Sequence, residues 1–109
     1  MQLNSTEHIV KERVPANLFR GIEAVGGRIN ITNERIIFNP HSFNIQTQPL
    51  VINISNIEKI EKRNTFKLIP NGIKIVTNTK QEYKFVVYKR SMLIELLNGL
   101  IFKDDPRQG

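Results

Sequence analysis

Residues 27–38, GRINITNERIIF, constrain the fold more than any other part of the chain. Apolar residues alternate with polar ones on both sides of the polar step at residues 32–35, and this alternation is typical of half-buried β-strands. If Asn33 and Glu34 are the two loop residues, the apolar residues of both strands fall on one face. The predicted cross-strand pairs are Ile31 with Ile36 and Ile29 with Phe38. The stretch therefore predicts a β-hairpin, with a type I turn and a bulge as the alternative to a two-residue loop.

The polar step of this hairpin also sets a hydroxyl, an amide, a carboxylate and a guanidinium side by side, so it is a candidate site for an anionic ligand. The predicted pairing explains the same residues without a ligand. We interpret Thr32 as the end of one strand, and Arg35 as a residue that closes the turn by bonding a backbone carbonyl or Glu34. Both residues are therefore predicted to be chiefly structural.

A second hairpin is predicted near the C-terminus. Residues 73–76 and 82–87 alternate in the same way, and residues 78–81, NTKQ, turn the chain between them. In this arrangement Lys74 and Lys84 share the outward face of the sheet.

The segments between these hairpins and before the first one are less regular. Residues 50–54 form an extended apolar run, and residues 54–63 suit either one helical turn that leads into a strand or an irregular strand. Residues 17–25 suit a short helix or an irregular strand. Gly26 and Gly27 are expected to break whatever precedes them.

The last element is predicted to be an amphipathic helix. Ser91 can act as its N-cap, and the helix ends near Asn98 or continues to Phe102 because Gly99 weakens its second half. The apolar stripe comprises Leu93, Leu96, Leu97, Leu100 and Ile101.

With 109 residues the chain can enclose one hydrophobic core, so we predict one domain at residues 17–102. Residues 1–16 are predicted to form a partly ordered arm, because Pro15 favours an extended lead-in, and residues 103–109 form a polar tail. Several strands followed by one helix predict a mainly β fold, namely a small sandwich or partly open barrel that the helix closes.

The composition indicates a cytoplasmic protein. The chain has no cysteine, which excludes disulfides, thiolate metal sites and a thiol nucleophile and is typical of reducing compartments. Its first residues lack the basic and apolar regions of a signal peptide, and no apolar stretch approaches the roughly 18 residues of a membrane span. Heavy use of Ile, Asn and Lys suits an AT-rich bacterial genome.

The net charge of +6 is concentrated in residues 59–90, where nine basic and two acidic residues give a local net charge of +7. Such a region can attract phosphate groups of lipids or nucleic acids, and the alternative is a solvated face that keeps the protein soluble. The candidate anion-binding or lipid-binding residues are Lys59, Lys62, Arg63, Lys67, Lys74, Lys84, Lys89 and Arg90.

No catalytic or metal-binding pattern is present in the sequence. His8 and His41 have no second ligand at a suitable spacing, and Glu58 and Glu61 could share a helical face but adjoin Lys62. We therefore predict neither an enzyme nor a bound metal or cofactor.

The loop after Pro40 is a candidate protein-interaction site, formed by His41, Ser42 and Phe43. An exposed aromatic residue beside a histidine can anchor a peptide. The alternative is that Phe43 belongs to the core while His41 caps the turn.

The order of the predicted elements, with GRINITNERIIF as one of the hairpins, resembles the GRAM domain family of the pleckstrin-homology-like fold. The shared pattern is a glycine-led strand followed by apolar-x-apolar-Thr-x-x-Arg-apolar-apolar-Phe. It falls here on Gly27, Ile29, Ile31, Thr32, Arg35, Ile36, Ile37 and Phe38. The likeness continues through LVINISNIEKIEKRN, IPNGIKIVT and EYKFVVYKR to the helix RSMLIELLNGLI, so it covers residues 17–102.

The resemblance implies a bent sandwich of seven antiparallel strands capped by one helix, and a non-catalytic binding or adaptor module. The expectation that the domain stands alone is a departure from the family, in which such domains are attached to others. We expect protein binding first, with a homo-oligomer formed through a strand edge as one form of it. Peripheral binding to anionic membranes through residues 59–90 is the alternative. Nucleic-acid binding is a weaker hypothesis, because the chain has no Trp, two Tyr and no aromatic residues interleaved with its lysines.

Overall fold

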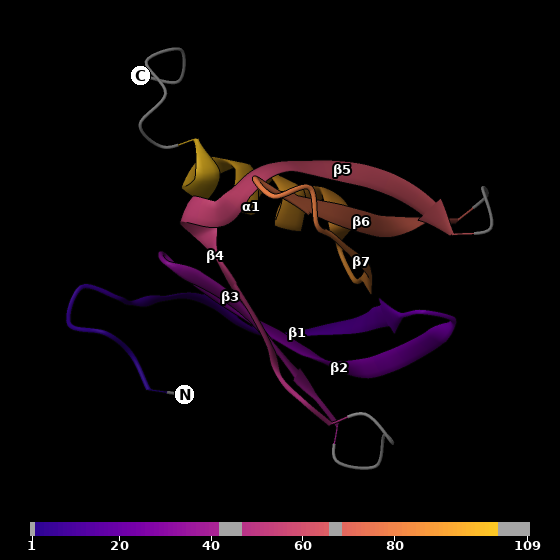
Figure 1. Ribbon diagram of the computed structural model, residues 1–109, viewed down its shortest axis with the longest axis horizontal. Coiled ribbons are helices and arrows are strands. Elements are labelled where there is room, and N and C mark those ends of the chain that lie inside the picture. The colour runs from indigo at the N-terminus through magenta and orange to yellow at the C-terminus, as the bar shows by residue number, and fades with distance from the viewer. Residues whose placement is uncertain (1, 42–46, 66–68, 103–109) are drawn as a thin grey trace.

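The computed structural model describes residues 2–41, 47–65 and 69–102, which form one antiparallel sheet and a C-terminal helix (Figure 1). The sheet has the strand order β4-β3-β2-β1-β7-β6-β5. The strands are β1 (Ile9–Arg20), β2 (Glu23–Thr32), β3 (Arg35–Pro40), β4 (Leu50–Asn53), β5 (Ile57–Thr65), β6 (Ile69–Thr77) and β7 (Glu82–Val87); a 3-10 helix, η1 (Ile54–Asn56), precedes β5, and α1 (Arg90–Ile101) follows β7. Figure 1 shows β1–β4 in a lower layer and β5–β7 in an upper layer, and α1 packs against η1, β5 and β6. The predicted fold class is confirmed.

The hairpin of β2 and β3 has the predicted register. Ile31 pairs with Ile36 and Ile29 pairs with Phe38, and all four side chains are buried. Burial therefore selects this register, because a shift by one residue would turn these side chains toward solvent.

The second predicted hairpin and the segment before it are also confirmed. Ile73 pairs with Phe85 and Ile75 pairs with Tyr83, with the turn between Thr77 and Glu82. Of the two alternatives for residues 54–63, the structure has the helical turn that leads into a strand, as η1 and β5.

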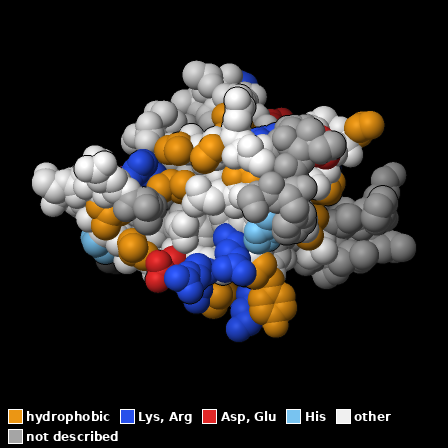
Figure 2. Space-filling view, turned by 90° about the horizontal axis from the view of Figure 1, so that it is seen from below, with side chains coloured by type: hydrophobic (Ala, Val, Ile, Leu, Met, Phe, Trp, Pro, Cys, Tyr) orange, Lys and Arg blue, Asp and Glu red, His pale blue; other side chains and the backbone are white. Residues whose placement is uncertain are grey.

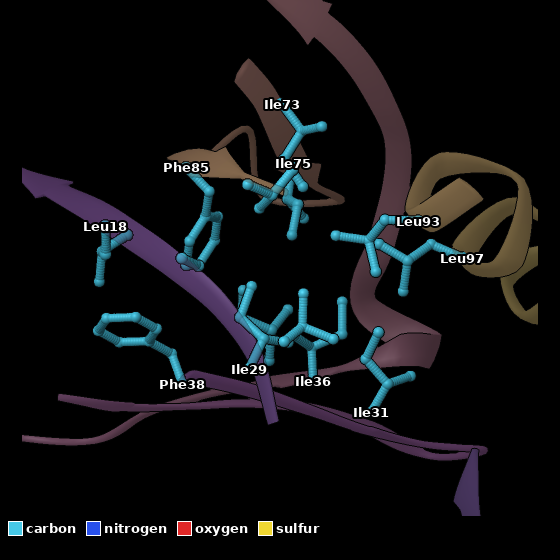
Figure 3. Close-up of a cluster of buried hydrophobic side chains, with 14 of the residues drawn as sticks. Leu18, Ile29, Ile31, Ile36, Phe38, Ile73, Ile75, Phe85, Leu93 and Leu97 are labelled. Carbon is cyan, nitrogen blue, oxygen red and sulfur yellow. The ribbon is translucent and has the colours of Figure 1, made fainter. Parts of the chain in front are cut away.

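The core joins the two layers and the helix (Figure 3). The rings of Phe38 and Phe85 meet edge to face with their centroids 5.7 Å apart, which links β3 in one layer to β7 in the other. Figure 3 shows Leu93 and Leu97 of α1 directed into the same cluster. Of the predicted helix stripe these two are fully buried, and the other three pack partly buried against the cluster.

The N-terminal part differs from the prediction. Strand β1 begins at Ile9, so half of the predicted arm lies in the sheet, and residues 17–25 hold the end of β1, a turn at Gly21 and the start of β2. A register irregularity between Lys11 and Val14 interrupts the alternation that would have indicated a strand. Pro15 is accommodated because the pairing of β1 with β7 begins only after it, at Ala16.

The glycine pair does not break the chain as predicted, because both glycines lie inside β2. A Cβ atom on Gly27 would lie 2.3 Å from the backbone oxygen of Asn39 and 2.8 Å from Cζ of Phe38. Gly27 is therefore required for the close approach of β2 and β3.

The helix begins one residue before the predicted cap. Its N-cap is Lys89, in the left-handed conformation with φ 58°, and Ser91 lies in the first turn. The helix continues through Gly99 to Ile101, which agrees with the longer of the two predicted ends. Among the residues that the structure describes, no helix is long and apolar enough to cross a membrane.

Candidate functional site

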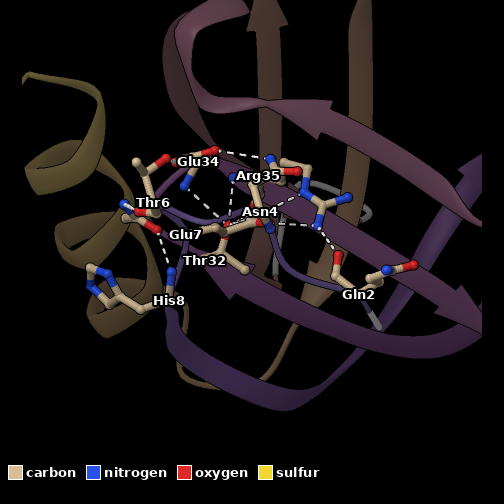
Figure 4. Close-up of polar contacts among 9 residues, drawn as sticks. Gln2, Asn4, Thr6, Glu7, His8, Thr32, Glu34 and Arg35 are labelled. Atoms are coloured by element: carbon tan, nitrogen blue, oxygen red, sulfur yellow. Dashed lines mark hydrogen bonds and ion pairs between the residues drawn. The ribbon is translucent and has the colours of Figure 1, made fainter.

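The polar step at residues 32–35 binds the N-terminal segment of the same chain (Figure 4). Arg35 donates from Nε and Nη2 to the two carboxylate oxygens of Glu7, at 2.7 Å in each case, and the hydroxyl of Thr32 donates to the same carboxylate. Arg35 also donates to the backbone carbonyl of Gln2 at 2.9 Å. A backbone carbonyl was a predicted partner, whereas the carboxylate belongs to Glu7 and not to Glu34.

The two loop residues complete this contact. Asn33 accepts a hydrogen bond from the backbone N–H of His8 and donates to the carbonyl of Thr6, while Glu34 accepts from the side chains of Thr6 and Asn4. The structural interpretation of the step therefore agrees with the geometry, since every side chain in it is engaged.

Electrostatics reinforces the contact at Glu7, whose side chain is buried. The pKa of Glu7 is lowered from 4.5 to about 2, chiefly by the hydrogen bond from Arg35. The bonds from Thr32 and the Asn4 amide contribute to the lowering, and burial of the carboxylate opposes it. The pKa of Glu34 is lowered chiefly by the hydroxyl of Thr6. The carboxylate of Glu7 thus stays charged and neutralises Arg35, so this guanidinium is not available to an anionic ligand.

Several lysines of the basic region at residues 59–90 form ion pairs with nearby carboxylates. Lys74 lies 3.4 Å from Glu61 and 3.8 Å from Glu82, and Lys59 lies 3.7 Å from Glu61. Lys80 is also paired, with a carboxylate oxygen of Glu58 at 2.6 Å. These lysines are compensated locally, which reduces the field that they present to a partner.

The predicted outward pair, Lys74 and Lys84, does occupy one face, because the two residues pair across β6 and β7. Lys84 has no carboxylate partner among the described residues, and neither do Arg63 and Lys62. Lys67 lies outside the described residues.

Arg63 and Lys84 line a shared hollow of about 290 Å³ together with Asn64, Gly21 and Phe19. Gly21 belongs to the turn between β1 and β2, so the hollow joins this turn to the end of β5. Figure 1 shows the β1–β2 and β5–β6 ends on the same side of the molecule. We call this region, with the adjacent turn residue Ile22, the tip hollow.

Arg90 forms hydrogen bonds with two residues that line the tip hollow, Arg63 and Asn64. Its Nη1 donates to the carbonyl of Arg63 at 2.7 Å and to the side chain of Asn64 at 3.2 Å. Because these bonds tie the first residue of α1 to the end of β5, Arg90 has a positioning role. Lys89, its neighbour, is exposed and lies on another surface, beside Tyr88.

Ile22 is the residue that sequence reasoning missed at the tip. It lies within residues 17–25, for which the sequence suits a short helix or an irregular strand, and its side chain is fully exposed, with a relative exposure of 105%. Gly21, with φ 65°, makes the tight turn that lifts Ile22 from the surface. The Gly-Ile pair between two apolar segments was the available signal.

His41 is the described member of the predicted interaction loop; Ser42 and Phe43 lie outside the described residues. The backbone N–H of His41 donates to the carbonyl of Gly26 at 2.9 Å, and its half-buried side chain lies near Asn17 along a hollow on the outer face of the sheet. His41 therefore continues the pairing of β3 with β2 beyond the end of the strand.

The described residues contain no group of three or more histidine, aspartate or glutamate side chains that could hold a metal ion. Glu58 and Glu61 both lie on strand β5 and each pairs with a lysine, so they do not share a helical face.

Two known proteins show sequence similarity to the chain. It is 36% identical over 70 residues to a UDP-sugar-dependent glycosyltransferase 52 of Dictyostelium discoideum, and 33% identical over 72 residues to the GRAM domain-containing protein 2A of Homo sapiens. The matches cover 64% and 65% of this chain but span only 4% and 20% of the two relatives. Catalysis by the first relative is therefore not transferred to this chain.

The fold is similar to that of solved pleckstrin-homology domains. The N-terminal PH domain of Vps36 superposes with a TM-score of 0.73 over 94% of this chain and 85% of that chain, at 14% sequence identity. The sequence model of the GRAM domain matches residues 1–101, which includes the segment that we predicted to be an arm. The chain therefore belongs to the GRAM domain family, whose domains are generally non-catalytic binding modules.

Proposed function

We propose that this chain is a peripheral module that binds anionic membrane surfaces through the tip hollow. The observation that carries the proposal is Ile22, a fully exposed isoleucine at the end of a tight turn, next to a hollow lined by Arg63 and Lys84. An apolar side chain lowers its free energy when it leaves water for the acyl region of a bilayer. The flanking cations would then lie at the level of the lipid phosphates.

The charge around the tip hollow supports this orientation. Arg63 and Lys84 are free of carboxylate partners within the described part of the chain, whereas Lys59 and Lys74 are paired with Glu61. Each basic residue near an anionic leaflet contributes about 1 kcal/mol of attraction, which salt screens. Of the lipid-binding residues predicted in residues 59–90, we therefore propose Arg63 and Lys84 as the ones that contact the membrane. A cytoplasmic location is part of the same proposal.

Protein binding, the first function that we expected from the sequence, is a second candidate. The observation that favours it is Tyr88, a residue that is 68% exposed on a surface separate from the tip hollow.

Vesicle co-sedimentation tests the membrane proposal. We expect the protein to sediment with vesicles of phosphatidylcholine and phosphatidylserine, and not with phosphatidylcholine alone, and the bound fraction should fall as salt is raised. Ile22→Asp should abolish sedimentation. Equal binding to both vesicle types, or binding to neither, would contradict the proposal.

A matched pair of charge variants locates the site. The double variant Arg63→Gln and Lys84→Gln should weaken vesicle binding by about 2 kcal/mol, a factor of roughly thirty. The control Lys59→Gln and Lys80→Gln removes the same charge near the start of β5, at the end opposite to Arg63, so its effect should be several-fold smaller because these positions lie farther from the membrane. Equal effects of the two double variants would show that net charge, and not the tip hollow, governs binding.

A further inference from the structure

A second surface, remote from the tip hollow, lies where the start of β1 meets the end of β7 and the start of α1. It encloses a hollow of about 240 Å³. We call it the basic-aromatic patch and define it by Lys11, Arg13, Tyr88, Lys89 and Met92, all of which line the hollow and are exposed. Figure 2, a view from the side on which β1 and β2 lie, shows Lys and Arg side chains gathered next to exposed hydrophobic ones.

The charge of the patch is not compensated from within the described residues. Its three cations face one carboxylate in the lining, that of Glu12, and none of them forms an ion pair with a described residue. Arg28, also exposed, lies directly across from Pro15 on β2 and extends the positive surface. The patch thus fits an anionic partner.

The patch also has an apolar centre. A partner that contributed only charged groups would leave this centre exposed to water. Tyr88 is 68% exposed and Met92 is 44% exposed, and Pro15 lines the same hollow. The Nζ of Lys89 lies 5.7 Å from the centroid of the Tyr88 ring, close enough for a cation–π interaction. Tyr88 nevertheless remains largely exposed. Tyrosine is among the residues that most often carry binding energy in protein interfaces, because it has a large area and few rotatable bonds.

The backbone holds two of the cations in a conformation that costs free energy. Arg13 and Lys89 both have positive φ, 59° and 58°, and both line the hollow. Arg13 lies within the register irregularity of β1, which displaces side chains from the regular alternation of the strand. The two unusual positions therefore direct charge toward one surface.

From these observations we infer that the basic-aromatic patch docks an acidic segment of a partner protein, one in which an aromatic or aliphatic side chain is flanked by carboxylates. The apolar side chain packs on Tyr88 and Met92, and the carboxylates pair with Arg13 and Lys89. This inference identifies the partner class for the protein-binding candidate and does not depend on membrane binding. Arg13 lies seven residues before the end of β1, roughly 20 Å along the strand, so the patch and the tip hollow can be occupied together.

Fluorescence anisotropy with synthetic peptides tests the inference. The probe is a pool of short fluorescein-labelled peptides with a central phenylalanine among glutamates and aspartates, and the reference pool has glutamine and asparagine at those positions. We expect the acidic pool to bind more tightly and to lose affinity with salt. Tyr88→Ala should weaken binding about tenfold, as for a central aromatic contact.

The charge test uses variants that preserve the backbone. Asn tolerates positive φ better than most residues, so Arg13→Asn with Lys89→Asn removes two charges without new strain. This double variant should weaken binding of the acidic pool by about tenfold. Lys80→Asn is the control for the single variants Arg13→Asn and Lys89→Asn, because Lys80 also has positive φ, 70°, but lies outside the patch and should leave binding unchanged.

The inference is overturned if the acidic pool binds no better than the reference pool, or if Lys80→Asn weakens binding as much as the patch variants do. It is also overturned if a single-stranded RNA oligonucleotide binds the patch more tightly than the acidic pool. Loss of vesicle sedimentation in the Arg13→Asn, Lys89→Asn protein would reassign the patch to the membrane, whereas retained sedimentation supports separate surfaces.

Discussion

Arg35 binds a carboxylate that comes from outside its own hairpin. The hairpin pattern was sufficient to predict that Thr32 and Arg35 are structural, because the alternation on both sides fixes where they lie. The partner Glu7 could not be predicted, since it lies 28 residues away in a segment without a periodic pattern. A residue's role can thus follow from its local register while its partner depends on the tertiary fold.

The lowered pKa of Glu7 predicts how stability depends on pH. Because the pKa is about 2 in the folded state and near 4.5 when unperturbed, the contribution of Glu7 is complete above pH 4.5 and is lost as the pH falls toward 2. Urea unfolding across this range should show a decline in stability that is shallower in Glu7→Gln, which is already less stable at neutral pH. An acid decline of the same size in both proteins would contradict this role.

At the scale of elements, the hairpins of β2 with β3 and of β6 with β7 could be predicted from the sequence. The start of β1 and the start of α1 could not. The hairpins alternate strictly, so burial and turn position agree. Strand β1 is interrupted by the irregularity near Arg13, which conceals its period, and α1 begins after a left-handed Lys89 that no N-cap preference predicts. The prediction that Gly27 breaks the chain was wrong. Glycine often ends a strand, but here its lack of a Cβ atom lets β3 pack closely against β2.

Two glycine substitutions test this packing. Gly27→Ala should destabilise the protein by at least about 2 kcal/mol, because the added methyl group meets the backbone of β3 and not a flexible side chain. Gly99→Ala is the matched control: it has open space within 4 Å and lies in α1, so it should stabilise by about 0.5–1 kcal/mol. Chemical denaturation measures both, and a neutral Gly27→Ala would refute the close-approach argument.

At the scale of the whole molecule, the net charge of +6 is less informative than its distribution. The basic region at residues 59–90 is evident from the sequence, but the position of Lys74 between Glu61 and Glu82 depends on the pairing of β6 with β5 and β7. Exposure of Ile22 and Tyr88 could not be predicted either, because apolar residues are more often buried. We therefore propose that the tip faces a membrane and that a separate lateral surface binds a protein.

The chain has no tryptophan, so one introduced at position 22 reports on that position alone. The measurement is the tryptophan fluorescence emission of Ile22→Trp as anionic vesicles are added. The control is Val51→Trp, because Val51 is also an exposed apolar residue but lies on β4. We predict a shift to shorter wavelength for Ile22→Trp, together with quenching by lipid-borne quenchers, and no change for Val51→Trp. A tryptophan at position 22 that keeps the emission of an aqueous residue while the protein is bound to the vesicles would contradict membrane binding through the tip.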